Sequence, residues 1–295
     1  MDQDDGEGAG RLVVAAPART APPPRSTALS LASFPHPPTL AQCNAVLDAP
    51  CYTPAQIATA YDVRPLWRAG IAGQGKTIVL VDSFGSPTIR HDLHTFDHAF
   101  GLPDPPRLEI IQPAGPAPRY DPKDRIQFGW ALETSFDVEW AHAIAPQASL
   151  LLVELPVSLG RAPGPQPPGV TGATGYPQMV AAEQDVLTHQ RGDVISQSFG
   201  ATEQAFPSAT TLRGLRAAYI TAAADHVSVL AASGDNGVSG LTLTGTLSPS
   251  RVVEWPASDP LVTAVGGTQL HLTAAGTRAA PDTVWAPGAA SPTSP

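Results

Sequence analysis

Residues 77–82 read TIVLVD, a short apolar run that ends in an aspartate. Continuous runs of this kind are typical of strands that are buried on both faces of a parallel sheet. Four similar runs follow along the chain, with helical patterns between them. The runs are 150–153, 194–198, 227–232 and 261–265, and the helical patterns are 88–100, 130–145, 179–190 and 209–226. This alternation predicts an α/β fold with a mostly parallel sheet and helices on both faces.

Polar side chains stand at the carboxyl ends of three of these runs. They are Asp82, Ser198 and Asp235. Ligand sites of open parallel sheets lie at the carboxyl ends of the strands. We therefore expect these side chains to contribute to one site.

The segment LETSFDVEWAHAIAPQA, residues 132–148, carries Glu133 and Asp137 four residues apart. One helical turn separates them, so both carboxylates share a helix face. Bulky apolar residues such as Trp130, Phe136 and Trp140 surround them, which predicts a largely buried helix with the acids at its least buried edge. Close, partly buried carboxyls rarely both stay ionised, so one of the two should have a raised pKa and serve in proton transfer.

The composition excludes several classes of function. A net charge of −9 without a basic run argues against nucleic acid and against an anionic membrane surface as partners. No apolar run reaches the length of a membrane span. With 295 residues and 42% hydrophobic residues, the chain is long enough for one large core.

Three regions are predicted along the chain. Residues 1–50 form a disordered Pro/Ala-rich leader, residues 51–285 the folded domain, and residues 286–295 a low-complexity tail. The domain should open with a helix that Thr53 caps and that has Pro54 at its first position. Residues 157–177 and 237–250, rich in Gly, Pro and Thr, are predicted to be surface loops.

Cys43 and Cys51 are the only cysteines. Their short separation allows a disulfide-closed loop, which would indicate an oxidising compartment. Two unrelated thiols are the alternative.

Four segments in order resemble the sedolisin, or serine-carboxyl peptidase, family. They are YDVRPLWRAGIAGQGKTIVLVDSFGSP at 61–87, ETSFDVEWAHAIAPQA at 133–148, DVISQSFGATE at 193–203, and SVLAASGDNG at 228–237 followed by WPASDPLVTAVGGTQL at 255–270. The resemblance runs from about Cys51 to Trp285 and implies a subtilisin-like fold. Each segment alone is a weak signal, whereas four in order are specific.

The resemblance also implies roles for individual residues. Glu133 matches the general base that takes the proton of a serine nucleophile, and Asp137 matches the acid that orients it. Asp235 matches the protonated aspartate of the oxyanion hole, and Asp82 stands where a supporting acid is often found. The strand that pairs with the substrate backbone is matched by Ser196, Ser198 and Gly200. A monomeric, secreted, acid-active endopeptidase with protein or peptide substrates is the implied function.

One motif of the family is not found in this sequence. The nucleophile of the family lies in Gly-Thr-Ser-x-x-x-Pro, and Gly267-Thr268-Gln269 has glutamine where the serine is needed. The sequence therefore resembles a peptidase domain cut off before its serine, and we expect little or no activity from it. The family's calcium site, near the domain's C-terminus, is also expected only in a complete domain, so no metal ligand is assigned here.

Alternative interpretations remain for these residues. The chain can be a non-catalytic peptide-binding remnant that keeps the strand around Ser196–Gly200. Asp82 can be the triad acid of a histidine-dependent, subtilisin-like peptidase, although Glu133 stands where that class needs histidine. Glu133 and Asp137 can also form a solvated helix face, and Asp235 can only stabilise a turn.

The histidines of HDLHTFDH are spaced so that they could bind zinc. They are His91, His94 and His98. Leu93, Phe96 and Phe100 define the buried stripe of that helix, so the histidines are predicted to be exposed. His142 is predicted to be a core residue with a hydrogen-bond partner.

Overall fold

The structure is a computed structural model that describes residues 37–47, 50–159, 174–242 and 246–285. The chain divides into two units, Met1–Pro50 and Cys51–Pro295. The described part of the first contains helix α1, Leu40–Leu47. The predicted leader up to residue 36 and the predicted tail 286–295 lie outside the described residues, as do parts of both predicted loops. Both cysteines are disulfide-bonded, as the first of the two alternatives predicted.

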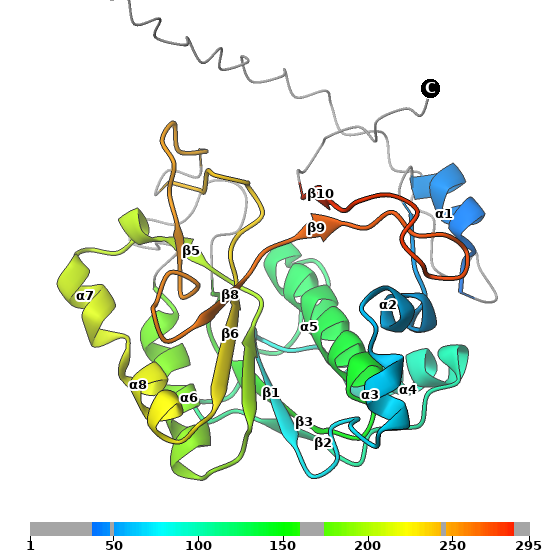
Figure 1. Cartoon of the computed structure of the whole chain (residues 1–295). Helices are drawn as coiled ribbons and strands as arrows, with labels where there is room; N and C mark the ends of the chain where they lie inside the picture. The colour runs from blue at the N-terminus through cyan, green and yellow to red at the C-terminus, as the bar shows by residue number, and fades with distance from the viewer. Residues whose placement is uncertain (1–36, 48–49, 160–173, 243–245, 286–295) are drawn as a thin grey trace, which may run out of the picture. The chain divides into compact units, whose positions relative to one another are not determined.

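The second unit is built on a six-stranded sheet with the order β2-β3-β1-β4-β6-β8, and every pairing in it is parallel (Figure 1). The strands are β1 (Thr77–Ser83), β2 (Leu108–Ile111), β3 (Ser149–Leu155), β4 (Val194–Gln197), β6 (Ser228–Ala232) and β8 (Thr263–Val265). The predicted α/β class and parallel sheet are confirmed. Strand β2 was not predicted, because LEII is short and its half-buried residues lack a clear pattern.

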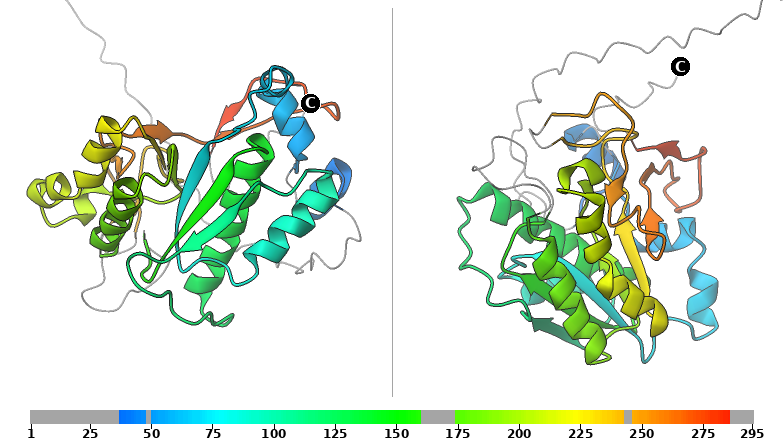
Figure 2. Two further views of the ribbon diagram at one scale, coloured as in Figure 1. Left: turned by 90° about the horizontal axis from the view of Figure 1, so that it is seen from below. Right: turned by 90° about the vertical axis from the view of Figure 1, so that its left-hand side faces the viewer.

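The two faces of the sheet support separate hydrophobic clusters. Leu80 of β1 packs with residues of β3, of α4 (Ile89–Phe100) and of α5 (Arg125–Ile144). Val79 and Val81 point the other way, toward α6 (Tyr176–Thr188) and α8 (Ala217–Ala224). Alternate side chains of one strand thus enter both clusters, which is why these strands read as continuous apolar runs. Figure 2 shows the two helix pairs on opposite sides of the sheet.

Two predictions about these elements were wrong in part. The strand predicted at 261–265 is present as β8 and pairs in parallel with β6, but its three residues are exposed instead of buried, because it is the last strand of the sheet. The single helix predicted at 209–226 is two helices, α7 (Ala209–Gly214) and α8. Gly214 ends the first, and Arg216 at the break forms a bidentate ion pair with Asp259.

Short elements complete the fold. Helix α3 spans Arg64–Arg68, and the 3-10 turn η2 spans Glu203–Ala205. Strands β5 (Ala201–Thr202) and β7 (Glu254–Trp255) form one antiparallel pair, and β9 (Thr268–Gln269) and β10 (Thr283–Val284) form another. Among the described residues, no helix is long and apolar enough to cross a membrane.

Helix α2, Pro54–Ala60, begins as predicted. Thr53 forms a capping box with Gln56, and Pro54 occupies the first turn. We expect Thr53→Ala to lower the free energy of unfolding by about 1 kcal/mol, since the Gln56 amide loses its acceptor. Urea titration followed by circular dichroism measures the change. The matched control is Thr59→Ala in the same helix, where the lost bond to the Ala55 carbonyl is offset by helix propensity. Equal losses in both variants would argue against the cap.

Candidate active site

Helix α5 carries the two central acids toward the carboxyl edge of the sheet. Asp124 caps it and accepts from the Ile126 amide at 2.9 Å. Glu133 and Asp137 are half-buried on this helix, and Asp82 is the sixth residue of β1. The three acids come together because β1 is an inner strand of the sheet and α5 packs against it.

Asp137 is held from the side of β4. The Ser198 hydroxyl donates to Asp137 Oδ1 at 2.9 Å. This bond favours the ionised form, but burial dominates and raises the pKa of Asp137. Ser198 therefore contributes its side chain to the acid cluster, in addition to the backbone role predicted from sequence.

Asp82 is the most deeply buried acid of the cluster, with 0% of its surface exposed. Burial first, and then the charges of Asp137 and Glu133, raise its pKa well above the usual range. Both Asp82 oxygens and Asp137 Oδ2 are buried without a hydrogen-bond partner as ionised groups. A proton on Asp82 removes this conflict, because the protonated carboxyl donates to the Asp137 carboxylate. The pair therefore shares one proton.

Glu133 lies at the outer side of the pair. Burial raises its pKa from 4.5 to about 7, with smaller contributions from the charges of Asp137 and Asp235. Since the charge of Asp235 acts on Glu133, Asp235, in the turn after β6, belongs to the same site. The structure thus brings together the acids predicted from sequence: Asp82, Glu133, Asp137 and Asp235.

Asp235 is exposed in the turn after β6. The turn needs glycine on both sides, because Gly234 has a φ of 101° and Gly237 a φ of 62°. An acid at the mouth of the site, next to a half-buried acid, is placed to meet a ligand rather than to fill the core.

The segment that follows β4 begins where the pairing of β4 with its two neighbouring strands ends. The ladders of β4 with β1 and β6 both end at Gln197. Ser196 lies within β4, whereas Ser198 and Gly200 lie beyond the ladder, where the structure assigns no strand. Residues 198–200 therefore have no ladder pairing with β1 or β6.

Glu254 of β7 is an acid that the sequence analysis missed. Its carboxyl group lies against Gly200, Gly234 and Gly240, where an added Cβ would come within 2.7, 2.8 and 3.0 Å of Glu254 side-chain atoms. Burial, and then the charge of Asp235, raise its pKa. Glu254 is missed because the β5–β7 pairing that brings it to Gly200 is invisible in local patterns, although three glycines facing one acid are a usable signal.

The predicted burial of α5 was wrong. Phe136 is 55% exposed and Leu132 is 43% exposed, whereas Thr134, Val138 and His142 are buried. The buried face of the helix is formed by Thr134, Val138 and His142, so its aromatic residues do not mark that face. The acids lie between the two faces, and this position explains their half-buried state.

The histidines behave as predicted. His91, His94 and His98 are exposed. His142 is fully buried, and its Nε2 lies 2.7 Å from the Pro103 carbonyl oxygen. Within the described residues, no group of three His, Cys, Asp or Glu could hold a metal ion, so the structure assigns no residue to zinc or calcium.

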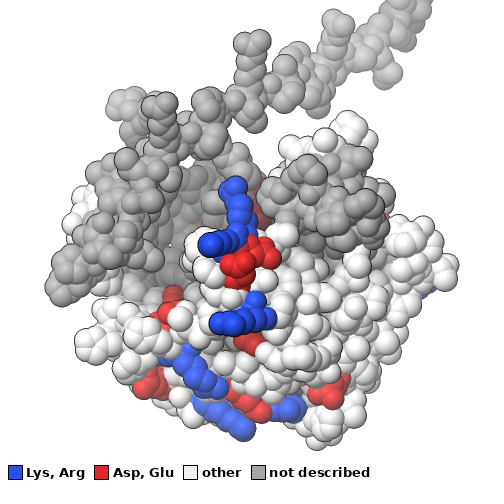
Figure 3. Space-filling model, turned by 180° about the vertical axis from the view of Figure 1, so that it is seen from behind, with Lys and Arg blue, Asp and Glu red and all other residues white. Residues whose placement is uncertain are grey.

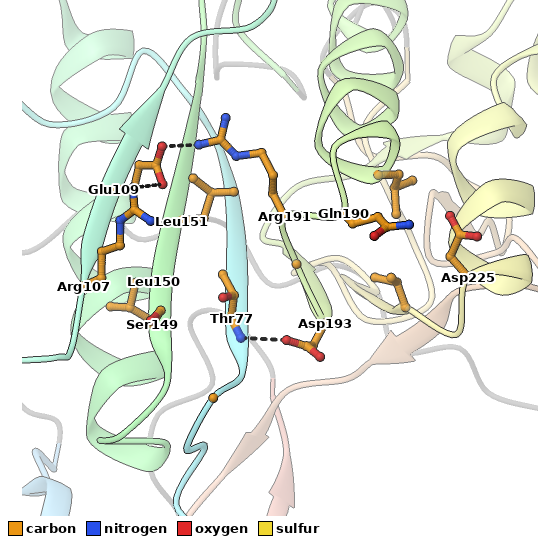
Figure 4. Close-up of a pocket in the computed structure, with 14 residues that line it drawn as sticks. Thr77, Arg107, Glu109, Ser149, Leu150, Leu151, Gln190, Arg191, Asp193 and Asp225 are labelled. Atoms are coloured by element: carbon orange, nitrogen blue, oxygen red, sulfur yellow. Dashed lines mark hydrogen bonds and ion pairs between the residues drawn. The ribbon is translucent and has the colours of Figure 1, made fainter.

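A cavity of about 620 Å³ lies at the opposite, amino-terminal edge of the sheet (Figure 4). Its charged groups largely pair with one another: Arg107 and Arg191 with Glu109, and Lys76, beside the cavity, with Asp193. Seen from behind, Lys and Arg side chains alternate with Asp and Glu, as Figure 3 shows. The cavity contains none of the acids described above, so its size does not make it the candidate active site.

Comparisons with known proteins agree with this geometry. No protein-family model matches the chain. Kumamolisin of Bacillus sp. strain MN-32 and sedolisin of Pseudomonas sp. strain 101 are each 28% identical over 238 residues, which is 80% of this chain and 37% of each relative. Pseudomonas sedolisin, a serine-carboxyl proteinase solved with two molecules of pseudo-iodotyrostatin, superposes with a TM-score of 0.61 at 27% identity. That match covers 80% of this chain and 59% of the solved one.

Over 80% of its length the chain is similar to members of the sedolisin family. Its parallel sheet with helices is the subtilisin-like fold of that family, as predicted. The chain spans 37% of the length of these curated relatives. The charged groups that act on Asp82 are Glu133 and Asp137, so its titratable neighbours are acids and not the histidine of the subtilisin-like alternative.

Proposed function

We propose that this chain forms the acid part of a serine-carboxyl peptidase active site that hydrolyses peptide bonds in proteins. The observation that carries the proposal is the cluster of Asp82, Glu133 and Asp137, all with raised pKa values, at the strand ends of a sedolisin-family domain. Carboxyls with raised pKa values can exchange protons with a reacting hydroxyl, whereas ordinary surface carboxylates are poor bases.

Each acid has a separate role in this proposal. Glu133 accepts the proton of the serine that attacks the peptide carbonyl, and later returns it to the leaving amine. Asp137, fixed by Ser198, orients Glu133, and the proton on Asp82 prevents two adjacent negative charges. Asp235 lies at the mouth of the site, and its carboxylic acid form is the donor of a hydrogen bond to the oxyanion.

The substrate is a polypeptide that lies along the segment after β4. Its backbone adds to Ser196, Ser198 and Gly200 as an extra strand, and this binding mode accepts many sequences. We also propose that the protein acts as a secreted monomer, and the disulfide-bonded cysteines support the extracellular location.

The nucleophile is expected in a Gly-Thr-Ser-x-x-x-Pro segment, which the 295 residues do not contain. The test compares this chain with the same chain extended by the C-terminal part of kumamolisin that carries the motif. We expect hydrolysis of a denatured protein by the extended protein only, in assays from pH 4 to pH 7, because Glu133 must be ionised to accept the serine proton and burial raises its pKa to about 7. Hydrolysis by the 295-residue chain would contradict the assignment of the nucleophile. A folded extended protein that binds peptides without cleaving them would favour the peptide-binding alternative.

Glu254 is expected to favour substrates with a cationic side chain. Its carboxylate lies between the segments that follow β4 and β6, so it is close to a side chain of a peptide paired with Gly200. We expect Glu254→Gln to lower the ratio of kcat/KM for lysine over leucine peptides by about 10-fold in the extended protein. Because the pKa of Glu254 is raised, the preference should strengthen as the pH rises and the carboxyl ionises.

The control for this variant is Glu203→Gln. Glu203 lies in the neighbouring turn η2 and accepts from Ser258 Oγ at 2.7 Å, away from Gly200. An unchanged lysine-to-leucine ratio in Glu254→Gln, or an equal fall in both variants, would remove Glu254 from substrate selection.

A further inference from the structure

Strand β4 carries a polar residue on its core side. Gln197 is 2% exposed and stands between Ser196 and Ser198. Side chains alternate along a strand, so Gln197 points toward α6 and α8 while its neighbours point toward α5. A buried amide at this position requires hydrogen-bond partners from those helices.

The partners are supplied by both helices. Gln197 Nε2 donates to Glu183 Oε1 of α6 and to the Tyr219 hydroxyl of α8 at 3.2 Å. The Tyr219 hydroxyl lies 3.4 Å from Gln197 Oε1, and Met179 Sδ lies 4.0 Å from Nε2. These contacts are the polar connection between β4 and the layer of α6 and α8.

Glu183 is the unusual member of this group. It is 0% exposed, its Oε2 has no partner, and it forms no ion pair with any described residue. The titratable group beside it is Tyr219 of α8, which in turn interacts with Tyr176 and Asp259. A buried carboxylate without a cation costs far more than a buried carboxylic acid. Burial accordingly raises the pKa of Glu183 from 4.5 to about 8, and the bond from Gln197 lowers it only in part.

We propose that Glu183 and Gln197 form a protonation-dependent support that holds β4, and through it Ser198, in position beneath the acid cluster. While Glu183 carries its proton, the neutral carboxyl accepts from the Gln197 amide inside the core. When the proton leaves to solvent, the charge must reach water, and α6 separates from β4 locally. Glu183 is thus a positioning residue, and the inference rests on the proposed function only in assigning Ser196–Gly200 to the substrate.

Hydrogen exchange of β4 amides tests this without a substrate. We expect the opening constant of β4 in the 295-residue chain to rise roughly 50-fold between pH 6 and pH 8, after correction for intrinsic exchange. Glu183→Gln keeps the shape and the acceptor without the charge, so most of this rise should disappear. A rise of the same size in Glu183→Gln, or protection in the unaltered chain that does not change with pH, would overturn the proposal.

Two controls distinguish local opening of β4 from changes elsewhere in the molecule. Glu139→Gln removes an α5 carboxyl whose pKa burial raises to about 7, and it should leave the exchange of β4 unchanged. Strand β3 reports global unfolding, so at pH 8 the opening free energy of β4 should be smaller than that of β3, and equal opening free energies in the two strands at both pH values would contradict a local support. If Glu183→Gln fails to fold, the comparison of β4 with β3 in the unaltered chain still decides.

Binding of pseudo-iodotyrostatin then links the support to the substrate site. If β4 is the peptide-pairing strand, affinity in the unaltered chain should fall between pH 6 and pH 8, and Glu183→Gln should retain it. A parallel loss of affinity in both proteins would contradict the positioning role. Absence of binding at every pH would count against the proposed function alone, because the exchange result does not depend on it.

Discussion

The free energy of unfolding of this chain is expected to fall by at least about 4 kcal/mol between pH 4.5 and pH 8, the change that Glu183 alone produces. The main contribution comes from Glu183, whose pKa burial raises from 4.5 to about 8. Glu133 and Glu139, both with pKa values of about 7, and Asp97, at about 6, act in the same direction. The folded chain therefore binds more protons than the unfolded chain over this interval.

The sign follows from proton linkage. A carboxyl with a raised pKa in the folded state contributes stability that is fully present below its unfolded pKa, and this contribution is lost as the pH rises through the folded pKa. Asp193 beside Lys76 and Asp282 beside Arg278 have lowered pKa values and act oppositely, but only as the pH falls through their acidic range. Their side chains are partly exposed, 36% for Asp193 and 20% for Asp282, so water screens both ion pairs and their contribution is small.

Urea titrations at pH 4.5, 6, 7 and 8 measure the change, with a constant slope m as the sign that the transition itself is unaltered. Glu183→Gln should flatten the profile and exceed the unaltered chain in stability at pH 8. A free energy of unfolding that increases from pH 4.5 to pH 8, as in proteins stabilised mainly by ionised carboxylates, would contradict the prediction.

The sheet and the cluster of acids could be predicted from the sequence because each depends on short-range patterns. The run TIVLVD shows a strand buried on both faces, and Asp82 at its end must lie at the carboxyl edge. The spacing of Glu133 and Asp137 places them on one helix face whichever way the helix is turned. The family resemblance joined these local features to Asp235, and the structure brings all four acids together.

The remaining features depend on contacts between distant segments. The rotation of α5 could not be read from its aromatic residues, because Phe136 faces outward and the small Thr134 faces the sheet. Glu254 reaches Gly200 only through the β5–β7 pairing. The bond between Gln197 and Glu183 joins a strand to a helix, and neither residue is unusual in its own segment.

Replacing the proton acceptor is expected to have the largest effect on catalysis. In the protein extended by a serine-containing segment, Glu133→Gln should lower kcat/KM by a factor of about 10² to 10⁴, since an amide cannot take the serine proton. Glu139→Gln is the matched control, because this carboxyl lies on the same helix with a similarly raised pKa but faces Asp92 and Asp97 of α4. Initial rates on a peptide substrate from pH 4 to pH 7 measure both variants. Near-normal activity in Glu133→Gln would remove it from the role of base.

The dependence of activity on pH distinguishes the role of Asp235 from that of Glu133. Asp235→Ala loses the oxyanion donor, so kcat should fall by about 10² to 10³ with little change in KM. Asp235→Asn retains an N–H donor that does not titrate, so part of the activity should return and should extend to higher pH than in the unaltered protein. This difference arises because the carboxyl of Asp235 donates only while it is protonated, whereas the amide donates at every pH. An identical pH profile in Asp235→Asn and the unaltered protein would show that Asp235 stabilises the turn between Gly234 and Gly237 and takes no part in the reaction.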